Sequence, residues 1–185
     1  MTDRESLRRL LLERSVQRGD FVLASGRHSS YYIDCRLATM SAEGMVLIGR
    51  MGWETIRQAG WRPAGVGGLT MGADPVAYAI AAASFGGDRP VNAFSVRKEA
   101  KDHGQGRLIE GNFKTGDQVV VVEDVITSGD SAARAIAAIE RAGGSVLGVL
   151  AVVDREQGGR VALESGGRRV VTLTSAGDLG LRELP

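Results

Sequence analysis

The stretch VVVVEDVITSGDSAA, residues 119–133, decides the fold of this 185-residue chain. Three further valines after Val119 lead into two adjacent acids, then a short turn of small and hydroxylated residues, and then an alanine-rich segment. A near-continuous apolar run is typical of a strand that is covered on both faces, as strands are in parallel sheets. A turn that opens a helix offers its backbone N–H groups to an anion. The stretch therefore predicts a buried strand, a phosphate-binding loop and a helix.

Composition indicates one globular domain without a marked overall charge. Hydrophobic residues make up 43% and charged residues 24% of the chain, and the formal net charge is +1. This balance argues against disorder and gives no global sign of nucleic-acid binding. The single cysteine, Cys35, forms no intrachain disulfide, which fits a reducing cytoplasm. The N-terminus lacks a secretory signal, and no apolar run is long enough to cross a membrane. We expect one cytoplasmic domain over residues 1–185, with neither nucleic acid nor membrane as a partner.

Segments typical of strands and helices alternate on both sides of the opening stretch. The expected strands are residues 64–69, 91–97, 118–125 and 145–155, and the expected helices are residues 41–60, 74–85 and 128–144. Asp74 is expected to be the N-cap of the second helix, with Pro75 at its first position. The alternation predicts an α/β protein in which a mostly parallel, twisted sheet is flanked by helices.

The first 40 residues follow a different pattern. Thr2 and Glu5 have the spacing of a capping box, and leucines follow on one face, which predicts a helix over residues 3–17. Two short strands are expected next, at residues 21–25 and 29–36, separated by a turn. We expect this segment to pack on the core of the domain.

The two adjacent acids, Glu123 and Asp124, need partners at the end of a valine strand. Burial disfavours a carboxylate that has none, and two like charges repel each other. They therefore indicate a cation, a hydroxyl-rich ligand such as a ribose diol, or both. Because successive strand residues point to opposite faces, the two acids need not share one task. A solvated strand end is the simpler interpretation of the acids alone.

The turn at residues 126–131 has the composition of a loop for a single phosphate group. Its backbone N–H groups and the hydroxyls of Thr127, Ser128 and Ser131 are possible donors to an anion. It lacks the lysine and glycines of a nucleotide P-loop, and with one glycine it is not a Rossmann fingerprint. An ordinary helix N-cap is the simpler alternative, because Ser and Asp are favoured there.

The segment at residues 98–107, KEAKDHGQGR, is polar and long for a connection inside a compact α/β domain. Such loops are usually functional lids or disordered. With Arg97 before it, the segment places four potentially cationic side chains in seven positions, which suits a polyphosphate. A solvated loop is the simpler interpretation. RNA binding is a further one, although no aromatic residues are interleaved to stack on bases.

Taken together, these motifs resemble those of the type I phosphoribosyltransferases. VVVVEDVITSGDSA is similar to the family's motif for phosphoribosyl pyrophosphate (PRPP), and GGLTMGADPVA is similar to its pyrophosphate loop. RKEAKDHG resembles the mobile catalytic loop of the orotate-using branch. FVLASGRHSSYYID and VVDRE resemble that branch's base-binding segment and orotate-contacting strand end. The motifs occur in family order across residues 21–155. The resemblance implies the type I phosphoribosyltransferase fold, with residues 1–40 as a small base-binding hood.

The resemblance also implies a reaction and a role for individual residues. The family transfers ribose 5-phosphate from PRPP to orotate, giving orotidine 5′-monophosphate and pyrophosphate in pyrimidine biosynthesis. Magnesium is the implied cofactor, held mainly through substrate oxygens without a dedicated protein site, and the implied assembly is a homodimer with shared active sites. The implied catalytic residues are Lys101, Arg97 and His103. The implied PRPP ligands are these three with Lys98, Glu123, Asp124, Val125, Ile126, Thr127, Ser128, Gly129, Asp130 and Ser131. The implied orotate contacts are Thr127, Arg155, Tyr31 and Tyr32. Within this scheme Lys98 serves its own subunit, whereas the lid residues Arg97, Lys101 and His103 act on the neighbouring one.

The chain departs from the family pattern at three positions. Ala24 and Met71 stand where many members carry lysine, so two cationic contacts are missing, and the sequence does not show what replaces them. Asp130 is an acid in a loop where threonine is common, and only its backbone N–H is expected to serve the phosphate. These differences bear on PRPP affinity more than on the type of reaction.

Two other functions remain open at this level. A transferase for a purine base would share the PRPP motif, but a purine has no carboxylate to pair with Arg155. A catalytically silent regulator that senses PRPP would have lost the cations of the lid or gained a nucleic-acid-binding module. The lid cations are present, and the roughly twenty residues before Phe21 are too few for such a module.

Overall fold

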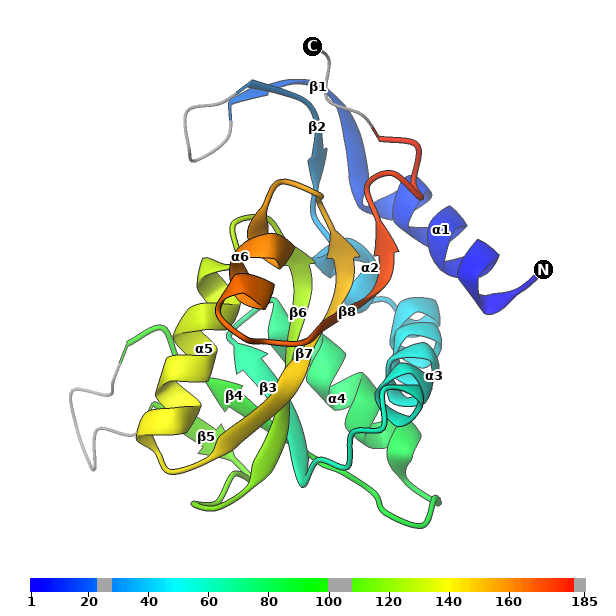
Figure 1. Cartoon of the computed structure of the whole chain (residues 1–185). Helices are drawn as coiled ribbons and strands as arrows, with labels where there is room; N and C mark the ends of the chain where they lie inside the picture. Colours follow the sequence, from blue (N-terminus) through cyan, green and yellow to red (C-terminus); the bar gives the residue numbers. More distant parts are fainter. Residues whose placement is uncertain (23–27, 100–107, 182–185) are drawn as a thin grey trace.

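The computed structural model describes residues 1–22, 28–99 and 108–181. Its centre is a six-stranded sheet with the order β5-β4-β3-β6-β7-β8, and a two-stranded sheet, β1-β2, stands above it (Figure 1). The central strands are β3 (Gly65–Leu69), β4 (Asn92–Val96), β5 (Ile109–Gly111), β6 (Gln118–Ile126), β7 (Ser145–Asp154) and β8 (Val170–Ser175). All neighbouring strands run parallel except β5, which is antiparallel to β4. The predicted mostly parallel sheet is confirmed.

Helices cover both faces of the sheet, and the valines of β6 show why. Val120 and Val122 pack in one apolar cluster with α3 (Ala42–Gln58) and α4 (Ala73–Ser84). Val119 and Val121 pack in a second cluster with α5 (Asp130–Arg141) and α6 (Gly159–Ser165). The strand residues alternate between the faces, so a continuous apolar run is needed to fill both sides.

The hood consists of α1 (Asp3–Arg14) and an antiparallel hairpin of β1 (Val16–Val22) with β2 (His28–Ile33). The capping box of α1 is confirmed, because the Glu5 backbone N–H donates to the Thr2 hydroxyl at 3.3 Å and the Thr2 N–H donates to the Glu5 carboxylate at 2.6 Å. The predicted helix end near residue 17 was wrong. The chain turns at Ser15 and enters β1, because Val16 finds its antiparallel partner in Ile33.

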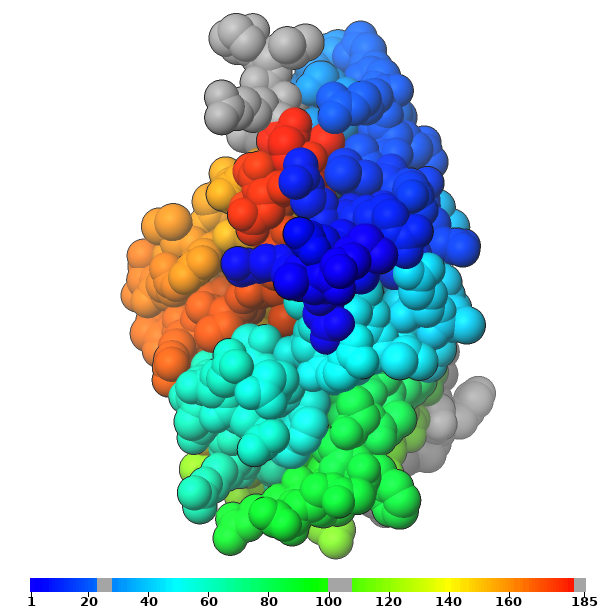
Figure 2. Space-filling model, turned by 90° about the vertical axis from the view of Figure 1, so that its right-hand side faces the viewer, coloured from blue at the N-terminus to red at the C-terminus, as the bar shows by residue number. Residues whose placement is uncertain are grey.

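The hood rests on the end of the sheet where the last described residues lie. Figure 2 shows α1 beside the last described residues and above α3, and Figure 1 gives the same arrangement from the side. The apolar side chains of Leu7, Leu10 and Leu11 are fully buried in the cluster that also contains Leu179 and Leu181. In the described part of the chain no helix combines the length and the apolar character that a membrane crossing requires.

Two other details of the predicted elements differ from the structure. The N-cap of α4 is Gly72, so Asp74 lies inside the first turn and Pro75 follows it. The Thr70 hydroxyl donates to the Asp74 carboxylate, which therefore serves the preceding loop and not the helix end. The helices α2 (Arg36–Thr39) and α6 and the strands β5 and β8 were not predicted. Of these, α2 and β5, with four and three residues, are too short to show a clear period.

Candidate functional site

The carboxyl ends of β3, β4, β6 and β7 meet at one edge of the sheet, because these strands are parallel neighbours. This edge carries the loop after β3, the start of the segment after β4, the loop after β6 and the residues after β7. Ligands of open α/β sheets bind in this position. The hairpin of the hood stands over the same edge (Figure 1).

The loop after β6 encloses a small hollow of about 90 Å³. Its lining consists of Glu123, Val125, Ile126, Thr127, Ser128, Gly129, Asp130, Ser131 and Ala132. Gly129 has a φ of 86° and is the N-cap of α5, so the chain turns sharply where the first free N–H groups of the helix begin. The hollow combines a helix N-terminus with hydroxyl groups, which suits one phosphate group.

The phosphate loop is fixed from behind by the start of α6. The Gly159 N–H donates to the Thr127 carbonyl at 3.0 Å. A Cβ atom at Gly159 would stand 2.5 Å from that carbonyl oxygen and 2.7 Å from the Gly129 nitrogen. Only glycine therefore permits this approach, and sequence reasoning missed the residue because the contact joins two loops far apart in the chain.

Asp130 is exposed at the mouth of this hollow, and its carboxylate accepts a hydrogen bond of 2.7 Å from the Ser128 hydroxyl. The Ser128 proton is thus directed to Asp130. The backbone N–H groups and the hydroxyls of Thr127 and Ser131 remain as donors for an anion.

The two acids at the end of β6 face different surroundings. Glu123 is only 4% exposed and lines the phosphate hollow. Asp124 lies against the loop after β3, where a Cβ atom at Gly72 would be 2.5 Å from its Oδ1 atom. The alternation of strand residues thus assigns Glu123 to the phosphate loop and Asp124 to the predicted pyrophosphate loop, whose Thr70–Met71 peptide bond is cis.

Burial governs the protonation of both acids. It raises the pKa of Glu123 to about 8, and the neighbouring Asp124 charge adds to this effect. Burial also raises the pKa of Asp124, although the hydrogen bond from the Val125 N–H, at 2.9 Å, acts in the opposite direction. Among the described residues, the Glu123 Oε1 atom is buried without a hydrogen-bond partner. Such an atom indicates a missing polar ligand, and a hydroxyl group would satisfy it.

We predict that Glu123→Gln changes the pH dependence of stability. Folded Glu123 holds its proton up to about pH 8, whereas the unfolded carboxyl releases it near the ordinary value of 4.5. Its stabilising contribution is therefore present below pH 4.5 and is lost as the pH rises to about 8. At pH 9 the melting temperature of the variant should be several degrees above that of the wild type, because each kcal/mol of unfolding free energy shifts it by about 2–4 °C. At pH 5 the two melting temperatures should be close.

Thermal unfolding followed by circular dichroism across this pH range measures the difference. Glu13→Gln, at an exposed glutamate of α1, serves as the control and should follow the wild type. A constant offset between Glu123→Gln and the wild type at all pH values would contradict the prediction.

The residues after β7 connect the sheet to the hood. Arg155 is only 7% exposed, and its backbone N–H donates to the Ile126 carbonyl at 3.0 Å, directly before the phosphate loop. Its guanidinium carbon lies 5.0 Å from the centre of the Tyr31 ring, and its Nη2 atom donates to the Ser29 hydroxyl at 3.4 Å. Ser29 is a neighbour of Arg155 that the sequence did not single out, although it lies in the quoted segment FVLASGRHSSYYID.

The two predicted tyrosines are not brought together. Tyr31 is 2% exposed and faces Arg155, whereas Tyr32 points to the other face of β2. The ring of Tyr32 lies 5.8 Å from that of Phe21, centre to centre. The alternation of side chains along a strand allows only one of two successive residues to face the rim.

Only the ends of the predicted lid lie within the described residues. The Arg97 N–H donates to the Leu108 carbonyl at 2.8 Å, and the Arg97 guanidinium pairs with Glu110 at 3.3 Å. The Lys98 carbonyl accepts a hydrogen bond from Arg134 on α5. Lys101 and His103 lie outside the described residues.

The acids of the rim fit a magnesium ion held mainly by a ligand. No group of three or more His, Cys, Asp or Glu side chains that could hold a metal occurs in the part of the chain that the structure describes. The rim supplies one carboxyl group on the side of the predicted pyrophosphate loop, that of Asp124, whereas Glu123 faces the hollow after β6 and its raised pKa, about 8, keeps it protonated at neutral pH. Magnesium in phosphate sites commonly takes one or two carboxylates and completes its shell with substrate oxygens and water.

Three larger hollows occur among the described residues. One of them, of about 590 Å³, lies between β5 and the end of α5, and the other two lie elsewhere. One, of about 530 Å³, is at the opposite edge of the sheet, before β3 and β4. Trp53, Trp61 and three arginines contribute to its wall. The other, of about 1130 Å³, is a groove along α1, α3 and α4. Neither is lined by any of the predicted site residues.

Comparison with known proteins identifies close relatives. The chain is 44% identical over 182 residues to orotate phosphoribosyltransferase of Aquifex aeolicus, covering 97% of this chain and 98% of the relative. It is 48% identical over 179 residues to the protein of that name from Mycobacterium tuberculosis H37Rv, covering 97% of each. No sequence model of a protein family matches the chain.

Solved structures give the same result. The crystal structure of the Mycobacterium tuberculosis H37Rv enzyme in complex with Fe(III) dicitrate has a TM-score of 0.85 at 46% identity, covering 97% of this chain and 100% of the other. The structure of that enzyme in complex with PRPP has a TM-score of 0.82 at 43% identity, with the same coverage. The α/β fold with its hood is thus shared along nearly the whole chain.

Proposed function

Because the chain belongs to the orotate phosphoribosyltransferase family, we propose that it transfers the ribose 5-phosphate unit of PRPP to N1 of orotate. The products are orotidine 5′-monophosphate and pyrophosphate, in a step of pyrimidine biosynthesis. The observation that carries this function is the place of Arg155. Its backbone is bonded to Ile126 at the start of the phosphate loop, and its buried guanidinium stacks on Tyr31 of the hood.

The phosphate loop, residues 127–131, holds the 5′-phosphate in this proposal. The neighbouring acids accept hydrogen bonds from the ribose hydroxyls, and the buried Oε1 atom of Glu123 gains the partner that it lacks. Lys98 binds the pyrophosphate group of its own subunit, whereas Arg97, Lys101 and His103 act on the neighbouring subunit. The separation of Glu123 and Asp124 onto two faces supports different contacts for the two acids.

The chemistry asks the protein to stabilise charge, and no covalent nucleophile is required. As the bond from ribose C1′ to pyrophosphate breaks, positive charge develops on the sugar and negative charge on the leaving group. Cationic side chains held in place before the reaction stabilise the leaving group where its charge grows. Bound magnesium, the proposed cofactor, would neutralise further charge on the phosphate oxygens. Glu123 and Asp124 orient the ribose through its hydroxyl groups.

Arg155 provides the basis for selecting orotate among bases. A guanidinium presents two parallel N–H groups to a carboxylate, and orotate carries one where uracil and hypoxanthine do not. Of the two predicted tyrosines, Tyr31 is the one that we propose as a base contact together with Arg155, because its ring faces that guanidinium.

The proposal is tested by incubating the protein with PRPP and Mg²⁺ and with orotate, uracil or hypoxanthine in parallel. Pyrophosphate release is measured with a coupled assay, and the nucleotide product is identified by mass spectrometry. We expect release with orotate only. Release with hypoxanthine and not with orotate would replace the proposal by a purine transferase, and no release with any base would reject it.

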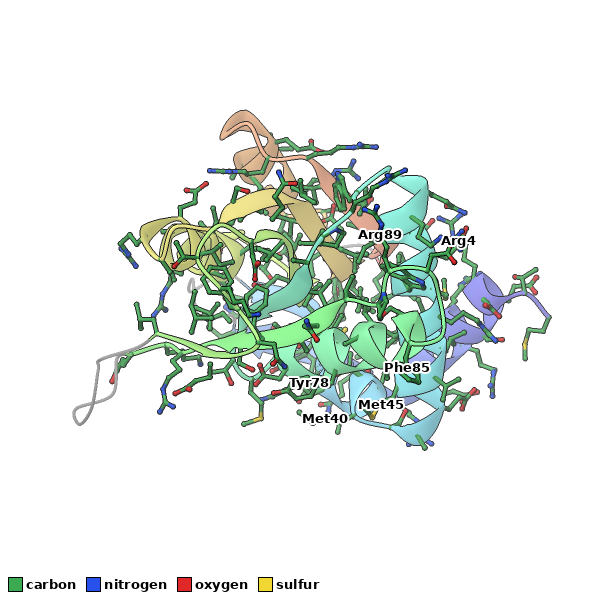
Figure 3. The ribbon with its side chains drawn as sticks, turned by 90° about the horizontal axis from the view of Figure 1, so that it is seen from below. Arg4, Met40, Met45, Tyr78, Phe85 and Arg89 are labelled. Atoms are coloured by element: carbon green, nitrogen blue, oxygen red, sulfur yellow. The ribbon has the colours of Figure 1, made fainter. Side chains whose placement is uncertain are left out.

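We further propose that two copies of the chain form a homodimer through the face made by the end of α2, α3 and α4. Met40, Met45, Tyr78 and Phe85 gather along one side of the molecule (Figure 3), and each is at least 39% exposed. Val46, on the same helix as Met45, is 68% exposed. Apolar patches of this kind on a folded chain mark interaction surfaces. The adjoining apolar groove along α1, α3 and α4 extends this face.

We predict that the double variant Val46→Asp, Phe85→Asp is a monomer. The free-energy penalty of burying two unpaired carboxylates in an apolar interface exceeds the stabilisation that the contact provides. Light scattering after gel filtration should give half the mass of the wild type, and activity should fall with it, since lid residues act across the dimer. Val161→Asp, at an exposed valine of α6, is the matched control. An unchanged mass of the double variant would place the interface elsewhere.

We place this reaction in the cytoplasm. The single cysteine, Cys35, is buried and free, and burial raises its pKa well above the ordinary value, so the thiol is kept in its unreactive form. A single cysteine that forms no disulfide is usual for proteins of reducing compartments. Fractionation of the source cells with an antibody to the chain tests the location, and enrichment in the membrane fraction would reject it.

A further inference from the structure

Arg134 lies on α5 and reaches across to the start of the predicted lid. Its Nη2 atom donates a hydrogen bond of 3.0 Å to the backbone carbonyl of Lys98. The two residues are 36 positions apart in the sequence. Arg134 has no role in the site as described so far, and its side chain is exposed apart from this contact.

The backbone at Lys98 is the point where the polar segment leaves the sheet. One residue earlier, the Arg97 N–H is bonded to the Leu108 carbonyl, so β4 remains in register with the strand that follows the segment. Lys98 follows the last sheet hydrogen bond. Within residues 1–22, 28–99 and 108–181, the bond from Arg134 is the side-chain contact that ties Lys98 to a helix.

The phosphate loop leads directly into the same helix, α5. Asp130 begins α5 directly after Gly129, and Arg134 stands about one turn later. A single rigid element thereby sets both the backbone donors for a phosphate and the position of Lys98. A ligand with phosphate groups at both ends, such as PRPP, requires these two sites at a fixed separation.

We propose that Arg134 is a positioning residue, which holds the Lys98 backbone so that the Lys98 ammonium meets the pyrophosphate group of PRPP. This inference rests on the function proposed above. In this proposal Arg134 acts through Lys98 and has no direct contact with either substrate. Its removal therefore leaves the phosphate loop intact and loosens one of the PRPP ligands.

Arg134→Ala tests the inference, with Arg141→Ala at the far end of the same helix as the matched control. Loss of one charge-assisted hydrogen bond at a partly solvated site predicts a rise of about fivefold in KM for PRPP. The KM for orotate, the melting temperature and the circular dichroism spectrum should stay at wild-type values. A purely structural role would move the melting temperature and both Michaelis constants together.

A double-mutant cycle isolates the effect on Lys98. In a Lys98→Ala background, Arg134→Ala should cause no further rise in KM for PRPP, because the side chain that it positions is absent. Two results would overturn the inference. One is a full fivefold rise in the KM for PRPP when Arg134→Ala is added to Lys98→Ala, and the other is a KM for PRPP of the Arg134→Ala single variant that is within twofold of the wild-type value.

The failure of this inference is distinguishable from a failure of the proposed function. PRPP binding is also measured directly by calorimetry, which requires no base and no turnover. The proposed reaction is rejected if the wild-type protein binds PRPP but releases no pyrophosphate with orotate. In that case the dissociation constants for PRPP of the wild type and of Arg134→Ala still test the positioning role. Equal dissociation constants for wild type and Arg134→Ala would reject the positioning role alone.

Discussion

Replacement of Lys101 by alanine is expected to lower kcat by about a thousandfold or more and to leave the fold unchanged. The leaving pyrophosphate gains negative charge in the transition state, and an ammonium group held against it is worth several kcal/mol in a site that excludes water. The segment that carries Lys101 starts and ends at the rim, because Arg97 and Leu108 are hydrogen bonded to each other.

Steady-state kinetics with saturating PRPP and orotate measures the effect. Lys114→Ala, at an exposed lysine in the turn before β6, provides a matched control and should retain wild-type kcat. Turnover of Lys101→Ala within tenfold of the wild type would reject the catalytic role.

Mixing experiments then show in which subunit Lys101 acts. Gly159→Val is expected to displace the phosphate loop, since even a Cβ atom would clash with the Thr127 carbonyl. Each single variant is inactive in this scheme, but a hybrid dimer of the two combines one intact loop with one intact Lys101 in the same site. Partial recovery on mixing is expected. Absence of recovery, with subunit exchange verified by differently tagged chains, would show that the sites are not shared.

Replacement of Arg155 by alanine should raise the KM for orotate by about a hundredfold and the KM for PRPP by less than threefold. A buried, bidentate guanidinium–carboxylate pair contributes about 3 kcal/mol to binding, which corresponds to that factor. The PRPP sites are separate from this contact, although Arg155 borders the phosphate loop through its backbone. The backbone hydrogen bond to Ile126 is kept in the variant.

Two further variants separate binding from packing. Arg155→Lys keeps the charge but loses the two-pronged geometry, so its KM for orotate should fall between those of the wild type and the alanine variant. Ser29→Ala removes the hydroxyl that accepts from Arg155 and should raise the KM for orotate only slightly. Equal increases for both substrates in Arg155→Ala, without a loss of stability, would contradict a contact to the base.

The fold was predictable from sequence where local patterns are long. The valine run of β6 indicated a strand covered on both faces, and the structure distributes these valines between two apolar clusters. The alternation of side chains along β6 also predicted that Glu123 and Asp124 need not share a task. In the structure the two acids face different loops. The capping box at Thr2 could be read in the same way, because its two hydrogen bonds join residues three positions apart.

The remaining features depend on contacts between distant segments. Gly159 and Thr127, or Ser29 and Arg155, are brought together only by the packing of loops and strands, and no local pattern marks them. The end of α1 was misplaced for the same reason, since the partner of Val16 lies in β2. Tyr32 was grouped with Tyr31 as a base contact, although the pleat of β2 sends the two rings to opposite sides.

The positions of the two tryptophans determine what intrinsic fluorescence can report about this protein. Trp53 and Trp61 both line the hollow at the edge of the sheet opposite the candidate site, and they are the only tryptophans in the sequence. Arg169 stacks on the indole of Trp61, at 5.5 Å from its centre, so melting of the core would expose that ring and shift its emission. Because Trp53 also lines the groove that extends the proposed dimer face, intrinsic fluorescence reports unfolding together with dissociation of the dimer. Titrations with PRPP or orotate require heat or absorbance as the readout.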